Sequence, residues 1–278
     1  MIPNYFHFVF GLRQKPEPLH LMHYLCLESC WQLHQPDAIF FYYHHEPYGA
    51  YWERLKPRLQ CVPIPRVAFI DQYRYADARV ARYRYAHASD FVRLEKLLAH
   101  GGVYADMDTL FVNPLPRALF AHSFVLGREQ KVYDKKTRTA HASLCNAFIL
   151  SERDASFGKL WLEKMTHVFD GTWSNHSTLL PDALAQEYPQ QIHIEPPRTF
   201  YKFMWTRADL AVLFQGLDTD NTGVVSFHLW SHLWWSRWRR DFSNFHAGKL
   251  TEDFVRRIDT TYNVVARQFL PPASRTRE

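Results

Sequence analysis

The sequence has few cysteines: four among 278 residues, at Cys26, Cys30, Cys61 and Cys145. A chain of this length buries enough apolar surface to fold without disulfides, so none are indicated, and a reducing cytoplasm suits it best. Cys26, Cys30 and His34 recur at helical spacing. Three ligands strung along one helix lie too far apart for a single zinc ion, and the same spacing is typical of a buried helix face.

Long hydrophobic runs are also absent. No stretch reaches the roughly 18 apolar residues that a membrane-spanning helix requires, and the run at residues 6–12 is interrupted by His7 and Gly11. The N-terminus, with Pro3 and no early basic residue, lacks the pattern of a secretory signal. We therefore expect a mature fold that begins at residue 1, does not span a bilayer and is cytoplasmic, with peripheral contact at the inner membrane face.

The net charge of the chain is also small. Lys and Arg number 33 against 28 Asp and Glu, which leaves a net charge of +5. This is too little for a protein that wraps nucleic acid, but it suits an anionic small ligand or transient contact with anionic lipid.

Internal repeats and low-complexity linkers are missing too. We expect one catalytic domain over residues 1–270 and a polar tail over residues 271–278.

What the sequence does contain is an alternation of short aromatic or β-branched runs with helix-like stretches. This pattern predicts an α/β fold in which helices connect the strands of a sheet. The expected strands are residues 5–10, 38–43, 62–70, 103–105, 144–150 and 224–227; the third is an edge strand because of its prolines. The expected helices are residues 19–33, 51–59, 81–100 and 157–169, the last capped by Ser156.

Two aspartates stand on either side of Met107, directly after a short apolar strand introduced by Gly101 and Gly102. Alternate side chains of an extended chain share a face, so Asp106 and Asp108 point the same way while Met107 packs inward. Two like charges this close are relieved by a divalent cation. Mg²⁺ or Mn²⁺ would keep open positions for phosphate oxygens, which favours a diphosphate ligand. The alternative is two solvated acids at a strand end.

Asp90 and Arg93 are three residues apart, hence on one face of the predicted helix. We interpret Asp90 as an acceptor of hydrogen bonds from sugar hydroxyls and Arg93 as a contact to a hydroxyl or a phosphate. The alternative is an exposed ion pair worth a few tenths of a kcal/mol.

The tyrosines and arginines of residues 73–85 resemble a nucleic-acid surface, but no nucleic-acid-binding signature accompanies them, so no such partner is expected.

Six segments in order along the first part of the chain resemble one family. They are Ile2-Pro3-Asn4, His7-Phe8-Val9-Phe10-Gly11, Ser29-Cys30-Trp31, Pro36-Asp37, Ala88-Ser89-Asp90-Phe91-Val92-Arg93 and Gly101-Gly102-Val103-Tyr104-Ala105-Asp106-Met107-Asp108. The chain resembles the D-x-D sugar-transferase family numbered thirty-two. That family includes capsular-polysaccharide and α-mannosyl or α-galactosyl transferases and is related to the large clostridial glucosylating toxins.

The resemblance implies a glycosyltransferase A fold, a Rossmann-like mixed sheet flanked by helices. It also implies Mn²⁺ or Mg²⁺, a nucleotide-sugar donor, with a UDP-sugar favoured over a GDP-sugar, and retention of anomeric configuration. Carried over by position, Phe10 stacks on the nucleotide base, and Asp90 and Arg93 hold the donor sugar. Asp106 and Asp108 lie at the ribose, metal and diphosphate.

Two later segments extend the resemblance. Asn146 resembles an asparagine that contacts the donor sugar; the alternative is a strand-end asparagine that caps its own backbone. Residues 228–235 resemble the family's closing motif, which implies His228 as a metal ligand, His232 as the second choice, and Trp234 as a lid contact with the leaving phosphate. The alternative there is a packed aromatic corner. No role is assigned around Pro181, where the family's glycine-proline pattern is missing.

These features predict a metal-dependent retaining glycosyltransferase that moves a sugar from a nucleoside diphosphate to a hydroxyl of a glycan or glycolipid in surface or capsular polysaccharide synthesis. No carboxylate is identified that would deprotonate the acceptor, which agrees with assistance from the donor phosphate. Residues Trp234–Arg240 form a patch suited to a membrane interface, unless its tryptophans pack inward. The alternatives are a protein-modifying transferase of effector type and a non-catalytic carbohydrate- or nucleic-acid-binding module.

Overall fold

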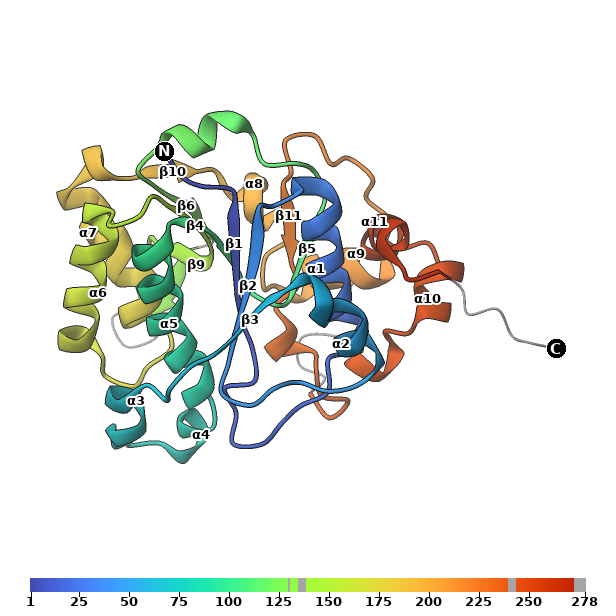
Figure 1. Cartoon of the computed structure of the whole chain (residues 1–278), viewed down its shortest axis with the longest axis horizontal. Coiled ribbons are helices and arrows are strands. Elements are labelled where there is room, and N and C mark those ends of the chain that lie inside the picture. The colour runs from blue at the N-terminus through green and yellow to red at the C-terminus, as the bar shows by residue number, and fades with distance from the viewer. Residues whose placement is uncertain (130, 135–138, 240–243, 273–278) are drawn as a thin grey trace.

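The computed structural model describes residues 1–129, 131–134, 139–239 and 244–272. Its centre is a seven-stranded sheet in the order β10-β6-β9-β4-β1-β2-β3 (Figure 1). The strands are β1 (Tyr5–Val9), β2 (Ala38–Tyr43), β3 (Gln60–Pro63), β4 (Gly102–Ala105), β6 (Phe124–Arg128), β9 (Leu144–Ser151) and β10 (His193–Glu195). Only β9 runs antiparallel to its neighbours, β4 and β6. The sheet is therefore mixed, as the sequence predicts.

Helices cover both faces of this sheet (Figure 1). One face carries α3 (Ala68–Gln72), α5 (Arg84–His100), α6 (Ser156–Val168) and α7 (Leu180–Glu187), and α4 (Ala78–Ala81) precedes α5. The other face carries α1 (Leu21–His34), α2 (Ala50–Leu55), α8 (Pro197–Tyr201), α9 (Arg207–Gln215), α10 (Glu252–Arg257) and α11 (Thr261–Ala266). Each face buries its own hydrophobic cluster, so the sheet is the middle layer of three.

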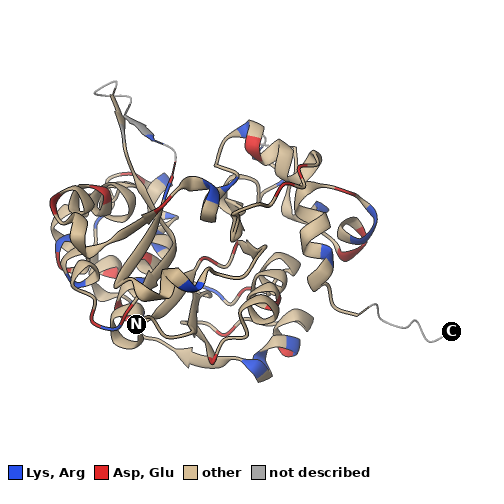
Figure 2. Ribbon diagram, turned by 90° about the horizontal axis from the view of Figure 1, so that it is seen from above, with Lys and Arg blue, Asp and Glu red and all other residues tan. Residues whose placement is uncertain are grey.

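Two small antiparallel sheets complete the strands. β5 (Thr109–Phe111) pairs with β11 (Ser226–His228), which brings a late segment of the chain beside the paired aspartates. β7 (Val132–Asp134) pairs with β8 (Thr139–His141) in a hairpin that projects from the body in Figure 2. The same view shows charged residues of both signs spread over the outer helices and loops.

Single-turn helical segments fill several connections. They are η1 (Lys56–Arg58), η2 (Arg117–Ala121), η3 (Asn175–Leu179), η4 (Pro189–Gln191), η5 (Ser231–Leu233), η6 (Ala247–Lys249) and η7 (Arg267–Phe269). η3 has the wider π-helical hydrogen bonding, and the others are 3₁₀ turns. Within the described ranges, no helix has both the length and the apolar character needed to cross a bilayer. The four cysteines are free thiols.

Most predicted elements are confirmed, several within one residue of an end, but three details are wrong. The expected strand over residues 62–70 is instead β3 followed by helix α3, because Pro63 and Pro65 cannot donate to a sheet ladder. The expected helix over residues 51–59 ends its α-helical part at Leu55, and Pro57 lies in the 3₁₀ turn that follows. Ser156 is the first residue of α6, not its cap. The predicted tail lies outside the described residues from position 273 on.

The double glycine that links α5 to β4 has a clear physical cause. Gly101 and Gly102 have φ values of +69° and +117°, a region that other residues rarely adopt. A Cβ on Gly102 would also lie 2.5 Å from the Tyr5 carbonyl oxygen on β1. These glycines therefore let β4 leave the helix at once and pair with β1, which places the paired aspartates at the carboxyl edge of the sheet.

Candidate active site

A pocket of about 700 Å³ opens at the edge of the sheet where β1, β4 and β6 end and β9 begins. Its lining includes Phe10 after β1, Asp106 and Asp108 after β4, Glu129 after β6 and Asn146 near the start of β9. In open α/β sheets, ligands bind outside the carboxyl ends of the parallel strands. This pocket is therefore the candidate active site.

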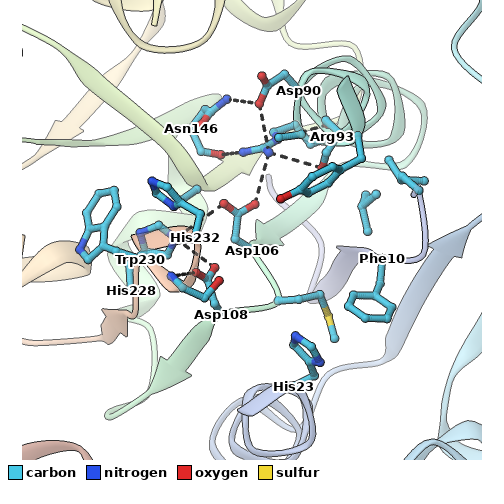
Figure 3. A pocket seen from close by; sticks show the side chains of 18 of the residues that line it. Phe10, His23, Asp90, Arg93, Asp106, Asp108, Asn146, His228, Trp230 and His232 are labelled. Atoms are coloured by element: carbon cyan, nitrogen blue, oxygen red, sulfur yellow. Dashed lines mark hydrogen bonds and ion pairs between the residues drawn. The ribbon is translucent and has the colours of Figure 1, made fainter. Parts of the chain in front are cut away.

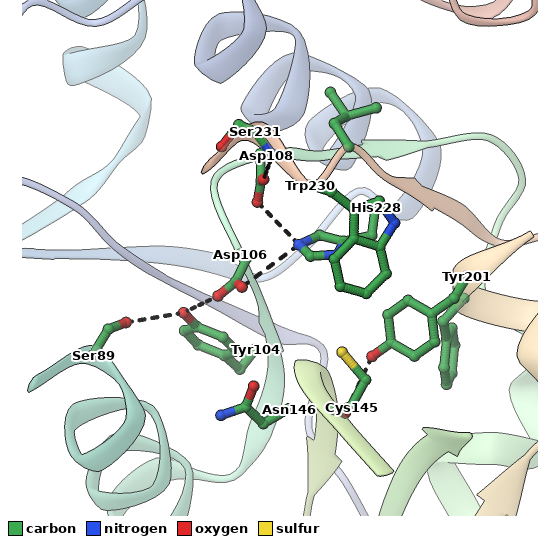
Figure 4. A network of polar contacts seen from close by, with 12 residues as sticks. Ser89, Tyr104, Asp106, Asp108, Cys145, Asn146, Tyr201, His228, Trp230 and Ser231 are labelled. Atoms are coloured by element: carbon green, nitrogen blue, oxygen red, sulfur yellow. Dashed lines mark hydrogen bonds and ion pairs between the residues drawn. The ribbon is translucent and has the colours of Figure 1, made fainter. Parts of the chain in front are cut away.

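The paired aspartates lie on a turn between β4 and β5 rather than within a strand. The Thr109 amide donates to the Asp106 carbonyl oxygen at 3.1 Å, which closes the turn. Met107 is 7% exposed and belongs to the core, as predicted. Both carboxylates face one side chain: the Nε2 atom of His228 lies 3.1 Å from Asp108 Oδ1 and 3.7 Å from Asp106 Oδ2 (Figure 4). The predicted convergence of the two acids is confirmed, although a turn produces it.

The closing segment, residues 228–235, also holds Asp108 in place. Trp230 has a φ of +52°, an uncommon value for a large residue, and the chain reverses there. The reversal aims the Ser231 amide at Asp108, and it donates to Oδ2 at 2.7 Å. Burial opposes ionisation of Asp108, but His228 and the Ser231 amide outweigh it, so the pKa of this carboxyl falls well below its usual range.

Asp106, Asp108 and His228 each offer a ligand atom, and these atoms all lie within 4.8 Å of one another. Two carboxylate oxygens and an imidazole nitrogen form a donor set that suits Mn²⁺ and also accepts Mg²⁺. Burial disfavours the charged imidazolium, yet the two carboxylates raise the pKa of His228 to about 9. The strongly negative surroundings of His228 Nε2 are what a divalent cation requires, so these residues fit such an ion.

A second polar network adjoins the first (Figure 3). Asn146 Nδ2 donates to Asp90 Oδ1 at 2.8 Å, and the Arg93 guanidinium donates to the Asn146 carbonyl oxygen at 2.6 Å. Arg93 also lies 3.1 Å from Asp90 and 3.3 Å from Asp106. Its side chain is only 5% exposed, so the alternative of an exposed helical ion pair is wrong. Asn146 donates to Asp90, and so the alternative of a backbone cap is wrong too.

Asp90 is held by a residue that the sequence analysis does not identify. His176 Nε2 lies 2.8 Å from Asp90 Oδ2, and the ring is fully buried. Burial opposes the charge on Asp90, but Arg93 and His176 outweigh it and lower the pKa of the carboxyl. Asp90 is therefore an ionised hydrogen-bond acceptor at neutral pH.

Phe10 lies on the side of the pocket that carries His23, away from Asp90 (Figure 3). Its ring is partly buried and packs against His23, with ring centroids 4.7 Å apart. Nearby, Arg13 donates to the Tyr85 hydroxyl at 3.0 Å, and both line the pocket. These aromatic surfaces have the shape that a planar base needs, and the stacking of a base on Phe10 stays a prediction.

The predicted lid contact between Trp234 and the leaving phosphate is wrong. The ring is fully buried, its Nε1 donates to the Leu229 carbonyl oxygen at 2.6 Å, and it packs on Phe214 and Phe245. It does not line the pocket, so it makes no lid contact; the neighbouring Trp235 does line it. His232 lines the pocket as well but is not part of the group formed by the aspartates and His228.

The predicted membrane patch over residues 234–240 is also corrected in part. Trp234 is buried, and Trp235 packs on His23 with ring centroids 5.6 Å apart, so two of its three tryptophans face inward. Trp238 is 78% exposed and carries the Arg237 guanidinium over its ring. Arg240 lies outside the described residues. The inward-packing alternative is therefore right for Trp234 and Trp235.

Sequence reasoning also misses one wall of the pocket. Trp173, Ser174, Ser177 and Thr178 line it from the loop before η3 and from η3 itself. A π-helical turn breaks the 3.6-residue period on which helix prediction relies, and such turns are common at functional sites. The isolated run of polar residues at 174–178 before an apolar helix was the available signal.

Glu129 is a further pocket carboxyl that the sequence analysis does not identify. It lies at the end of β6 and contacts Ser143, Cys145 and Thr178. Burial raises its pKa to about 7, from an ordinary value of 4.5.

This raised pKa predicts a pH-dependent stability effect. The folded chain holds the Glu129 proton more tightly than the unfolded chain, so folding loses stability as pH rises from about 4.5 and the full penalty is present above about 7. Glu129→Gln removes that penalty. Relative to the parent, the variant should gain up to about 3 kcal/mol between pH 4.5 and pH 8 in urea unfolding. Exposed Glu163→Gln is the control. If the difference in free energy of unfolding between Glu129→Gln and the parent does not change with pH, the raised pKa of Glu129 is contradicted.

Comparisons with known proteins show which families and proteins the chain is similar to. Residues 26–126 match the family model described as glycosyltransferase sugar-binding region containing DXD motif. The chain is 26% identical over 281 residues to Glucan organizing enzyme 1 of Cryptococcus neoformans var. grubii, covering 98% of this chain and 72% of that protein.

Two solved structures share the fold along nearly the whole chain. Galactosyltransferase LgtC in complex with donor and acceptor sugar analogs is 12% identical, with a TM-score of 0.51, over 97% of this chain and 98% of that one. An active-site mutant of LgtC is 14% identical, with a TM-score of 0.50 and the same coverage. At these identities the likeness shows the fold alone, and it confirms the predicted glycosyltransferase A fold.

The segment that matches the family model contains Asp90 and Arg93 as well as the turn with the two aspartates. The D-x-D pair that the model describes is thus the pair that meets His228 in the pocket. Residues 26–126 thus match a sugar-binding region that contains the DXD motif, and the chain is a glycosyltransferase with the glycosyltransferase A fold.

Proposed function

We propose that this glycosyltransferase moves a sugar from a nucleoside diphosphate to a hydroxyl of a glycan, with a divalent cation held by Asp106, Asp108 and His228. The observation that carries the proposal is the contact of 3.3 Å between Arg93 and Asp106. It joins the Asp90 network to the metal-binding group in one pocket. A single ligand with a sugar at one end and a diphosphate at the other fits this arrangement.

When bound, Mn²⁺ or Mg²⁺ supplies positive charge that stabilises the departing diphosphate. The residues of the chain prepare the site for it. His228 and the Ser231 amide hold Asp108 in place, and Arg93 does the same for Asp106. Because these side chains are fixed before the ligand binds, little reorganisation is needed when charge develops on the leaving group.

Asp90 is the proposed contact to the donor sugar. It accepts hydrogen bonds from Asn146 and His176 and forms an ion pair with Arg93, and an ionised carboxylate has about four acceptor positions, so at least one remains for a sugar hydroxyl. Arg93 already meets two carboxylates and a backbone carbonyl. We therefore assign Arg93 the task of orienting Asp90 and Asp106 rather than binding a phosphate itself.

The aromatic rings of the pocket and the name of a relative support a base and an acceptor. Phe10 and its neighbouring aromatic rings favour a stacked base, and we retain a UDP-sugar as the preferred donor. The name of the fungal relative, Glucan organizing enzyme 1, supports a glycan as the acceptor. Transfer with retention, assisted by the donor phosphate, stays part of the proposal.

A donor screen tests the proposal. The full chain is incubated with UDP-sugars and GDP-sugars with Mn²⁺, with Mg²⁺ or with EDTA, and the release of nucleoside diphosphate is measured. We expect release from one or more nucleotide sugars that depends on the cation and stops with EDTA. If no nucleotide sugar binds or is consumed in the presence of either cation, the proposed function is wrong.

A further inference from the structure

Trp173 differs from the other aromatic side chains of the pocket in its exposure. It lines the pocket from the loop between α6 and η3, and 42% of the residue is accessible to solvent. Trp230, which lines the same pocket, is 5% exposed. Because this indole also lines the pocket, its uncovered surface is open to a bound ligand, and covering it would add the hydrophobic gain of burial.

The ring of Trp173 is held in a defined place. It packs on His232 of the closing segment, with ring centroids 5.1 Å apart and planes 31° apart, and meets Tyr83 edge-on at 5.4 Å. The Ser177 hydroxyl donates to the Trp173 carbonyl oxygen at 2.7 Å. The π-helical turn thus anchors the backbone of Trp173, so the exposed indole is positioned before a ligand arrives.

Trp173 lies at the sugar end of the pocket. On helix α5, His87 lies 6.2 Å from it between ring centroids. His87 is three residues before Asp90 on the same helix, hence on the same face. The indole therefore adjoins the proposed donor-sugar contact.

The chemistry around the indole distinguishes between ligands. Ser174, Ser177 and Thr178 place hydroxyl groups on the same wall, and His232 adds an imidazole. An apolar ring face beside hydrogen-bonding groups matches a pyranose, which has a face of C–H groups and an edge of hydroxyls. A phosphate group would need an available cation. In the described part of the pocket, the two arginines are Arg13 and Arg93, and each already pairs with a carboxylate.

We infer that Trp173 forms part of the acceptor subsite and that one sugar ring of the proposed glycan acceptor stacks on its indole. The inference rests on the proposed function, since it names the acceptor of that same reaction. It assigns Trp173 to the acceptor and leaves the donor to Asp90, Asn146 and the metal-binding group. Transfer to a saccharide should therefore depend on Trp173 more strongly than hydrolysis of the donor by water does.

The test uses the full chain, the nucleotide sugar and cation identified by the donor screen, and four free disaccharides: lactose, maltose, mannobiose and laminaribiose. Product formation is followed by mass spectrometry, and donor hydrolysis is measured without saccharide. We expect the parent to glycosylate at least one disaccharide. Trp173→Ala should raise the KM for that disaccharide about tenfold, the size expected for losing one stacked ring. Trp173→Phe should recover part of the loss.

Trp238→Ala is the matched control, because Trp238 is also exposed but lies outside the pocket lining. It should change neither reaction, whereas Trp173→Ala should impair transfer to the disaccharide more strongly than donor hydrolysis. Thermal unfolding checks that both variants fold. The inference is overturned if the parent hydrolyses the donor but glycosylates no disaccharide, or if Trp173→Ala leaves the acceptor KM unchanged or impairs hydrolysis equally. Absence of all donor hydrolysis in the parent would instead refute the proposed function, and the inference would fall with it.

Discussion

Asp108→Asn should lower metal-dependent turnover of the nucleotide sugar by more than about 100-fold, because even residues that only support metal ligands typically contribute 10–100-fold. The substitution keeps the size of the side chain but removes its charge. Asp108 is the carboxylate nearest to His228 Nε2, at 3.1 Å, and it is held by the Ser231 amide. Turnover is measured as a function of Mn²⁺ concentration, and the apparent affinity for Mn²⁺ should fall with it.

The control for this variant is Asp253→Asn, an exposed aspartate that pairs with Arg257 on α10. It should leave both turnover and the Mn²⁺ response unchanged. Circular dichroism and thermal unfolding establish that Asp108→Asn is folded. A folded Asp108→Asn protein with parental activity and parental Mn²⁺ dependence would rule out this carboxylate as a ligand.

Arg93→Met should destabilise the fold by about 3–5 kcal/mol, the usual result of removing one partner of a buried ion pair. The guanidinium is 5% exposed and meets two carboxylates, and its loss leaves Asp90 with an uncompensated charge. Activity should fall to background as well, since the same group orients both carboxylates. Urea unfolding and donor hydrolysis are the two measurements.

A paired substitution separates the buried charge from general damage to the core. Asp90→Asn in the Arg93→Met background should restore part of the lost stability, because the uncompensated charge is then gone, so the two effects are not additive. Neither change should restore activity. Glu95→Gln, on the exposed side of the same helix, is the control and should be silent. Fully additive effects would mean that Asp90 and Arg93 are not coupled.

Much of this site could be predicted from the sequence because its residues follow local rules. Asp106 and Asp108 come directly after a strand, and Asp90 and Arg93 share a helical face, so neighbouring positions determine where they point. The burial of Arg93 could not be predicted in this way. It depends on β9, whose Asn146 carbonyl accepts from the guanidinium over a separation of 53 residues.

The errors have the same origin. Trp234 and Trp235 are adjacent, and no local pattern says which one reaches the pocket; the reversal at Trp230 decides it, and it buries Trp234 against α9. Glu129 has no distinctive neighbours in the sequence, and Trp173 is marked only by the polar run that follows it. They become site residues only because β6 ends at the sheet edge and because η3 has π-helical rather than α-helical hydrogen bonding.

The pairing of β5 with β11 limits what a fragment of this protein can do. An excised piece spanning residues 26–126 would retain both aspartates, Asp90 and Arg93, yet it would lack the imidazole at position 228 and the amide at position 146. Strand β5 would also lose the antiparallel neighbour that ties the aspartate turn to the rest of the fold. The segment that carries the recognisable motif is thus not a complete site, because the chain after residue 126 supplies one of the three metal-ligating side chains and the amide that holds Asp90.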